Sequence, residues 1–143
     1  MPILKLSTAG ADGMLNGTSV GAQCNSGKVR IYSGTMPATA NTALSGNTLL
    51  AEASFAATAF GTAAAGSGTD RQITAAAISP VTAAAGDGTN PATFFRAFRT
   101  DGTTVVFQGD AGTTTQTMVL NAANIIQGGT VTINSVVLTL PTE

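Results

Sequence analysis

The sequence has few of the side chains that carry out chemistry: no histidine, no tryptophan, one cysteine, and six basic and seven acidic residues in 143. Most enzyme sites need a general acid or base, an activated nucleophile or a set of metal ligands. The sequence therefore predicts a protein that is not an enzyme and that holds no metal and no cofactor. We expect it to act through its surface and shape.

Charge is equally scarce, with a formal net charge of −1 and no run of like charges. Nucleic-acid binding needs a clustered basic face, which the scattered basic residues do not form. No stretch supplies the roughly 20 mostly apolar residues of a membrane-spanning helix. The start of the chain also lacks an apolar run typical of a secretory signal. We expect no nucleic-acid partner, no membrane, and synthesis in a cytoplasm.

Alanine, threonine and glycine fill almost half of the chain, whereas valine, isoleucine, leucine and phenylalanine make up about a fifth. This composition predicts a thin core, and Cys24 has no second cysteine with which to form a disulfide. We therefore expect a domain that gains stability from a partner or from copies of itself. Cys24 is expected to be a small, partly buried thiol.

Short alternating segments separated by Gly/Asn-rich turns predict β-structure. In the segment 28–33, for example, Val29 and Ile31 share one face and Lys28 and Arg30 the other. Many short strands with little helix indicate an all-β fold, an antiparallel β-sandwich or jelly roll. The predicted strands are 28–33, 49–59, 71–79, 93–100, 103–108, 115–120 and 130–140.

The segment 7–20 is the one helix expected before the last quarter of the chain. Ser7 or Thr8 can cap it, and Met14 and Leu15 are expected to face inward. Three glycines within the segment each cost about 1 kcal/mol relative to alanine. The prediction is one short, irregular N-terminal helix.

Asp101 and Gly102 stand between two predicted strands and favour a two-residue hairpin with a type I′ turn. In the strand that precedes them, Phe94 and Phe98 share one face and Phe95 takes the other. Aromatic side chains on both faces indicate a strand in the middle of the sandwich.

The last quarter of the chain has no charged residue between positions 111 and 142. We predict a turn at 109–112, a helical turn at 121–127 and a bulge near Asn134 and Ser135, where the apolar alternation changes phase. Exposed edge strands usually carry charge. Either these strands lie inside a sheet, or a neighbouring subunit covers part of their surface.

Two motifs come close to known sites and fail. The segment 21–28 resembles a phosphate-binding loop, but its spacing is one residue too long and Val29 replaces the required Ser or Thr. Asp87 lies in a Gly-rich turn that has too few carboxylates for calcium. Aspartate is favoured in such turns because it hydrogen-bonds to its own backbone.

Four stretches carry a resemblance across most of the chain from residue 28 onward. Residues 28–37 and 41–52 (KVRIYSGTMP and NTALSGNTLLAE), followed by Phe94-Phe95-Arg96 and by residues 100–106 (TDGTTVV), resemble a family of small virion proteins of tailed bacteriophages. The resemblance implies a capsid decoration, or cement, protein of jelly-roll type. Such a protein binds the outer surface of an icosahedral head and bridges major capsid subunits.

The resulting hypothesis is a single β-sandwich domain over 1–143, with an N-terminal arm and short helix in 1–27 and strands in 28–141. The expected partners are the major capsid protein and a second copy, as a dimer, on the virion surface. The alternatives are a tail- or baseplate-associated virion protein and a receptor- or carbohydrate-binding module. The predicted contact residues are Pro2, Ile3, Leu4, Leu6, Met36, Pro37, Val136, Leu138 and Leu140.

Overall fold

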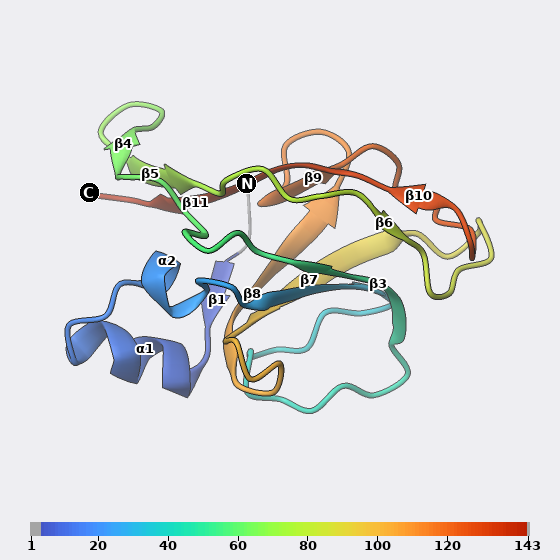
Figure 1. Ribbon diagram of the computed structural model, residues 1–143, viewed down its shortest axis with the longest axis horizontal. Coiled ribbons are helices and arrows are strands. Elements are labelled where there is room, and N and C mark those ends of the chain that lie inside the picture. Colours follow the sequence, from blue (N-terminus) through green and yellow to red (C-terminus); the bar gives the residue numbers. More distant parts are fainter. Residues whose placement is uncertain (1–3, 143) are drawn as a thin grey trace.

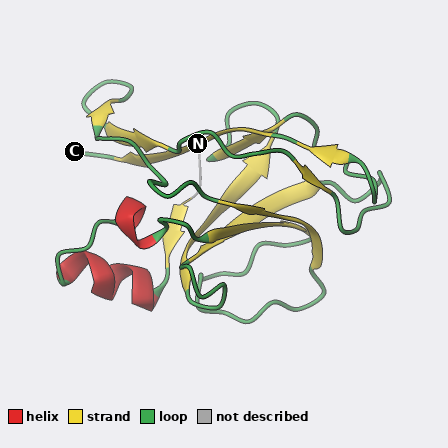
Figure 2. Ribbon diagram, in the orientation of Figure 1, coloured by secondary structure: helices red, strands yellow, loops and turns green. Residues whose placement is uncertain are grey.

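The computed structural model describes residues 4–142, which form strands with two short helices (Figure 2). The predicted all-β sandwich is confirmed, and Pro2 and Ile3 lie outside the described residues. The helices are α1 (Thr8–Leu15) and α2 (Val20–Gln23). The strands are β1 (Leu4–Leu6), β2 (Lys28–Ser33), β3 (Thr48–Ser54), β4 (Ala64–Ala65), β5 (Arg71–Thr74), β6 (Val81–Thr82), β7 (Ala92–Phe98), β8 (Val105–Gly112), β9 (Met118–Leu120), β10 (Thr130–Val131) and β11 (Ile133–Leu140).

The strands lie in two layers (Figure 1). The hydrogen-bonded order is β3-β2-β7-β8-β9-β11-β5-β4, with β1 added to β8, and β10 pairs with β6 in a separate ribbon. In Figure 1 the helices lie at one end of the sandwich, next to β1. Strand structure therefore begins within the segment predicted as an arm and a helix, since β1 is already part of the sheet.

One strand pair departs from the antiparallel prediction, because β8 and β9 run parallel. The predicted turn at 109–112 is wrong: β8 continues to Gly112. Thr117 donates its backbone N–H to Asp110 Oδ1 at 2.9 Å, which closes the short connection between the two strands. A side-chain hydrogen bond of this kind leaves no mark in the apolar periodicity, and the sequence pattern therefore missed it.

The main core lies between the two layers. Val29, Ile31 and Phe95 contribute from β2 and β7, and Val136 and Leu138 contribute from β11. The predicted inward face of residues 28–33 is confirmed, since Val29 and Ile31 are fully buried. Burial of these β-branched and aromatic side chains is the main favourable term that holds the layers together.

The outer face of β7 is buried as well, as the aromatic pattern predicted. Phe94 stacks on Tyr32 with ring centroids 5.2 Å apart, and Phe98 lies under the Arg30 guanidinium at 4.5 Å. Beside them Arg96 is buried without a carboxylate partner in the described part of the chain, and desolvation lowers its pKa from the usual value.

The loop 34–47, which crosses the lower side of the molecule in Figure 1, covers this outer face. Arg96 Nη2 donates to the Thr42 carbonyl at 2.6 Å, and Gln108 Nε2 donates to the Pro37 carbonyl at 2.8 Å. Arg96 Nε also donates to Gln108 Oε1 at 3.1 Å. The buried polar groups thereby hold the loop against the sheet.

The N-terminal helix is present, and its predicted cap is confirmed: Gly10 donates its N–H to Ser7 Oγ at 2.9 Å. The expectation that Met14 and Leu15 face inward is wrong, because their exposed fractions are 44% and 87%. The residue that α1 buries is Gly10. A helix that packs through a glycine has no apolar stripe for sequence analysis to detect.

The hairpin between β7 and β8 is confirmed, but its turn is not type I′. That turn needs positive φ at both central residues. Gly102 has φ of 68°, whereas Asp101 does not have positive φ. Asp101 Oδ1 instead accepts the N–H groups of Thr103 and Thr104, both at 2.8 Å. Hydrogen bonds from Thr104 and then Thr103 lower the pKa of Asp101 to about 2.

The remaining boundaries differ more modestly. The strands predicted at 49–59 and 71–79 are shorter, ending at Ser54 and Thr74. The helical turn predicted at 121–127 is a loop without helix. The bulge predicted near Asn134 and Ser135 is confirmed by the register shift between β11 and β9.

The uncharged C-terminal strands lie inside the sheet. β9 stands between β8 and β11, and β11 stands between β9 and β5. Of the two explanations for the missing charge, the first holds for β9, which has a neighbour on both sides and needs no charge against pairing. β11 pairs with β9 through Ile133–Val136 and with β5 through Val137–Leu140, so each half of β11 is paired along one edge in these registers.

Candidate binding groove

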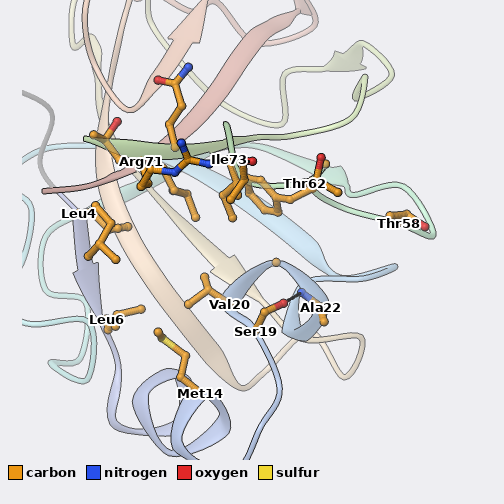
Figure 3. Close-up of a pocket in the computed structure, with 18 of the residues that line it drawn as sticks. Leu4, Leu6, Met14, Ser19, Val20, Ala22, Thr58, Thr62, Arg71 and Ile73 are labelled. Atoms are coloured by element: carbon orange, nitrogen blue, oxygen red, sulfur yellow. Dashed lines mark hydrogen bonds between the residues drawn. The ribbon is translucent and has the colours of Figure 1, made fainter. Parts of the chain in front are cut away.

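An open apolar groove of about 520 Å³ lies at the end of the sandwich that carries the helices (Figure 3). One side is formed by β1, α1 and α2, and the other by β5, the end of β11 and the segment that precedes β4. Its large apolar lining residues are Leu4, Leu6, Met14, Val20, Phe60, Ile73, Leu138 and Leu140.

Hydrogen bonds to the sheet and to Arg99 hold the helical side of the groove in place. Ser7 donates its N–H to the Val106 carbonyl at 3.0 Å, which docks the start of α1 on β8. Arg99 Nη2 donates to the Ala9 carbonyl at 2.9 Å and to Gln23 Oε1 at 2.8 Å, and so ties both helices to the sheet. The two helices, too short to be stable alone, are thus positioned by the sheet.

Several large apolar side chains at the groove are in contact with solvent. The exposed fractions are 38% for Leu6, 44% for Met14 and 66% for Leu140. In Figure 3 Leu4, Leu6, Met14 and Val20 gather around one hollow. Apolar patches that remain exposed are characteristic of interaction sites, because covering them is favourable.

Among the described residues that line the groove, Arg71 has the one charged side chain. Its Nη2 donates to the Ala63 carbonyl at 3.3 Å. Within residues 4–142 the ion pair that forms is Arg30 with Glu52, so Arg71 has no carboxylate partner there. The described lining of the groove is therefore apolar with a single positive charge.

The structure divides the predicted contact residues into separate groups. Leu4, Leu6, Leu138 and Leu140, taken from the two ends of the chain, meet in the groove. Met36 and Pro37 are half-buried in the loop over the other face of the sheet. The choice of Val136 as a contact residue is wrong, because it is fully buried in the core. Pro2 and Ile3 fall in the part that the structure does not describe.

Sequence reasoning missed the rest of the lining. Val20 belongs to α2, a helix that the glycine-rich sequence did not predict, and Phe60 and Ile73 come from the middle of the chain. The apolar character of these residues was visible, but the pattern held no signal that would place them beside the N-terminal strand.

Titratable groups elsewhere are structural. In the described part of the chain no three acidic, cysteine or histidine side chains come together as metal ligands would. Asp87 accepts the N–H groups of Thr89 and Asn90, both at 2.8 Å, and hydrogen bonds from Asn90 and then Thr89 lower its pKa. These are the turn contacts expected of aspartate.

Cys24 is fully buried, and burial raises its pKa to about 12 despite the nearby Arg99. The raised pKa keeps the thiol protonated at neutral pH and lowers the thiolate fraction about a thousandfold relative to an ordinary thiol. We expect iodoacetamide at pH 8 to label the folded protein at least about a hundredfold more slowly than the guanidinium-unfolded chain. Mass spectrometry measures both rates, and similar rates would contradict the burial.

Comparisons with protein-family models, with curated proteins and with solved structures found no match to this chain. Neither of the helices in residues 4–142 has the length and hydropathy needed to cross a bilayer.

Proposed function

We propose that this chain is a structural virion protein that decorates the outer surface of an icosahedral phage head and stabilises it by bridging major capsid subunits. The observation that carries the proposal is the open apolar groove at the helical end of the sandwich, where Leu6, Met14 and Leu140 remain exposed. The sequence resemblance to phage decoration proteins supports the same function.

The physical requirements of head decoration suit this molecule. A decoration protein works through many modest contacts that the capsid lattice repeats, so that avidity holds an interface that is weak in any one copy. A ligand that binds only the assembled lattice also stabilises that lattice by mass action. Both effects need a surface that can be covered, and neither needs a reacting group.

Leu140→Ser tests the groove, because Leu140 lines it and is 66% exposed. We expect the variant to bind undecorated heads at least about tenfold more weakly than the parent, since burial of one large apolar side chain contributes about 1.5–3 kcal/mol. Sedimentation of heads with increasing protein measures the affinity. Deletion of residues 2–6 is a poorer test, because it also removes the pairing of β1 with β8.

Leu15→Ser is the matched control. Leu15 is 87% exposed and does not line the groove, so this leucine-to-serine change is expected to leave head binding unaltered. Equal affinities for Leu140→Ser and the parent would remove the groove from the interface. An image reconstruction of intact virions with density for the protein confined to the tail would overturn the head assignment.

A further inference from the structure

We infer that the free edge of β1 accepts an extended segment of the major capsid subunit as an added β-strand, whose alternate apolar side chains extend into the groove and whose carboxylate pairs with Arg71. This inference rests on the proposed function and names the part of the partner that the groove receives. It follows from the free backbone edge of β1, from its side-chain directions and from the charge of the groove.

The backbone of β1 has one free edge. β1 pairs with β8 in the register Leu4↔Gly109, Lys5↔Gln108 and Leu6↔Phe107, and it pairs with no other strand in residues 4–142. Ser7 donates its N–H to the Val106 carbonyl at 3.0 Å. Because hydrogen-bonded pairs alternate along an antiparallel ladder, Lys5 also faces β8, whereas the N–H and C=O groups of Leu4 and Leu6 point to the opposite edge.

These outward groups form a ready template. By this alternation the N–H and C=O of Leu6 take no part in the ladder with β8, and β1 pairs with no other strand among the described residues. An unpaired strand edge of this kind accepts an extended segment through main-chain hydrogen bonds, while pockets for alternate side chains supply specificity.

The side chains of β1 point in directions that fit such a segment. Leu4 and Leu6 line the groove, and Lys5 points to the other face, where its Nζ donates to the Ala38 carbonyl at 2.9 Å. Directly paired residues of neighbouring strands lie on the same face of a sheet. Every second side chain of an added strand therefore lies on the groove side. The volume of the groove, about 520 Å³, is enough for a few such side chains, as a short extended segment would supply.

The charge of the groove indicates what else the segment carries. Within residues 4–142, Arg71 is the only charged residue that lines the groove, and it has no carboxylate partner there. A guanidinium binds a carboxylate through two parallel N–H···O bonds, which are stronger than neutral hydrogen bonds. An aspartate or glutamate in the partner segment would supply this carboxylate.

A second copy of this chain fits the edge less well. Antiparallel pairing of two β1 strands about a two-fold axis at Lys5 would place the two ammonium groups directly opposite each other, which is destabilising. Residues 1–6 also contain no acidic residue that could meet Arg71. The free edge therefore favours a different chain, and within the proposed function that chain is the capsid subunit.

Leu6→Pro compared with Leu6→Ala tests the added strand. Both substitutions remove the leucine side chain, but only proline removes the outward N–H, and proline is tolerated where the N–H of an edge strand faces away from the sheet. Leu6→Ala is expected to bind heads several-fold more weakly than the parent, and Leu6→Pro at least about tenfold more weakly than Leu6→Ala. Circular dichroism and thermal melting check that both variants are folded.

Hydrogen exchange of the parent protein gives a second readout that needs no variant. We expect the peptide containing Leu4–Leu6 to exchange more slowly when the protein is bound to heads than when it is free in solution. In a separate binding experiment, we expect Arg71→Gln to weaken head binding and to make that binding less dependent on salt concentration. Protection of this peptide in free protein that increases with protein concentration would indicate a second copy and overturn the inference.

The outcomes separate the inference from the proposed function. Suppose that the parent protein binds heads, but exchange at Leu4–Leu6 is unchanged on binding and Leu6→Pro binds as well as Leu6→Ala. This result would contradict the added strand and leave the proposed head decoration intact. Parent protein that fails to bind undecorated heads overturns both. If Leu6→Pro does not fold, the exchange measurement on the parent decides.

Discussion

Phe107→Ala is expected to lower the free energy of unfolding by about 3–5 kcal/mol, the usual cost of truncating a buried aromatic side chain. Phe107 is fully buried, with its ring centroid 5.7 Å from that of Phe95 and 6.4 Å from that of Phe60. Loss of the ring leaves a cavity between the layers. Urea denaturation followed by circular dichroism measures the change.

Phe107→Leu is the control for this prediction, since it keeps an apolar side chain and most of the volume and is expected to cost less than about 1.5 kcal/mol. Phe60 lines the groove and packs on Phe107, so Phe107→Ala is also expected to loosen the groove wall. A loss below about 1 kcal/mol for Phe107→Ala would show that the neighbouring side chains collapse into the cavity, and would contradict the prediction.

Gly10→Ala is expected to destabilise the protein by about 2–3 kcal/mol, although the same change in an exposed helix stabilises it by about 1 kcal/mol. A Cβ atom on Gly10 would lie 2.2 Å from the carbonyl oxygen of Val106 in β8. That oxygen belongs to the backbone and accepts the Ser7 N–H, so it cannot move aside without breaking the contact. Thermal melting of the variant and the parent gives the sign directly.

Gly61→Ala is the matched control for Gly10→Ala. A Cβ atom there would meet its nearest neighbour, the Thr74 carbonyl oxygen, at 3.8 Å, and Gly61 is not among the glycines with positive φ. Its expected effect is within about 0.5 kcal/mol of zero. A stabilising Gly10→Ala would mean that α1 does not pack closely on β8, and the helical side of the groove would then lack its anchor.

Sequence analysis recovered the strands whose apolar residues alternate. In β2 the alternation placed Val29 and Ile31 in the core, and in β7 aromatic residues on both faces correctly indicated a central strand. The bulge in β11 was also predictable, because a phase change in the apolar pattern is itself a sequence feature.

The errors occurred where side-chain contacts override local pattern. Asp101 accepts hydrogen bonds that set its turn geometry, and Asp110 closes a connection between two parallel strands. In α1 the contact with the sheet is made through Gly10, so that Met14 and Leu15 face solvent instead. None of these arrangements has a period that a sequence window can report.

The candidate site was predicted in part. Leu4, Leu6, Leu138 and Leu140 were chosen because they lie in an N-terminal arm and in uncharged terminal strands, and the structure brings all four into one groove. Val136 was chosen for the same reason but is buried in the core. The alternation along β11 showed that its two faces differ. It could not show that the facing layer covers Val136 but leaves Leu140 exposed at the end of the strand.

By itself the sequence determined that the chain is built from strands and that its few titratable groups are dispersed. These properties follow from composition and from the two-residue period of β-structure, which are local. Only the tertiary structure decided that β1 and the end of β11 share a groove and that, within residues 4–142, β1 leaves a backbone edge unpaired and Arg71 has no carboxylate partner. Those features depend on contacts between residues far apart in the sequence, and no local pattern encodes such contacts.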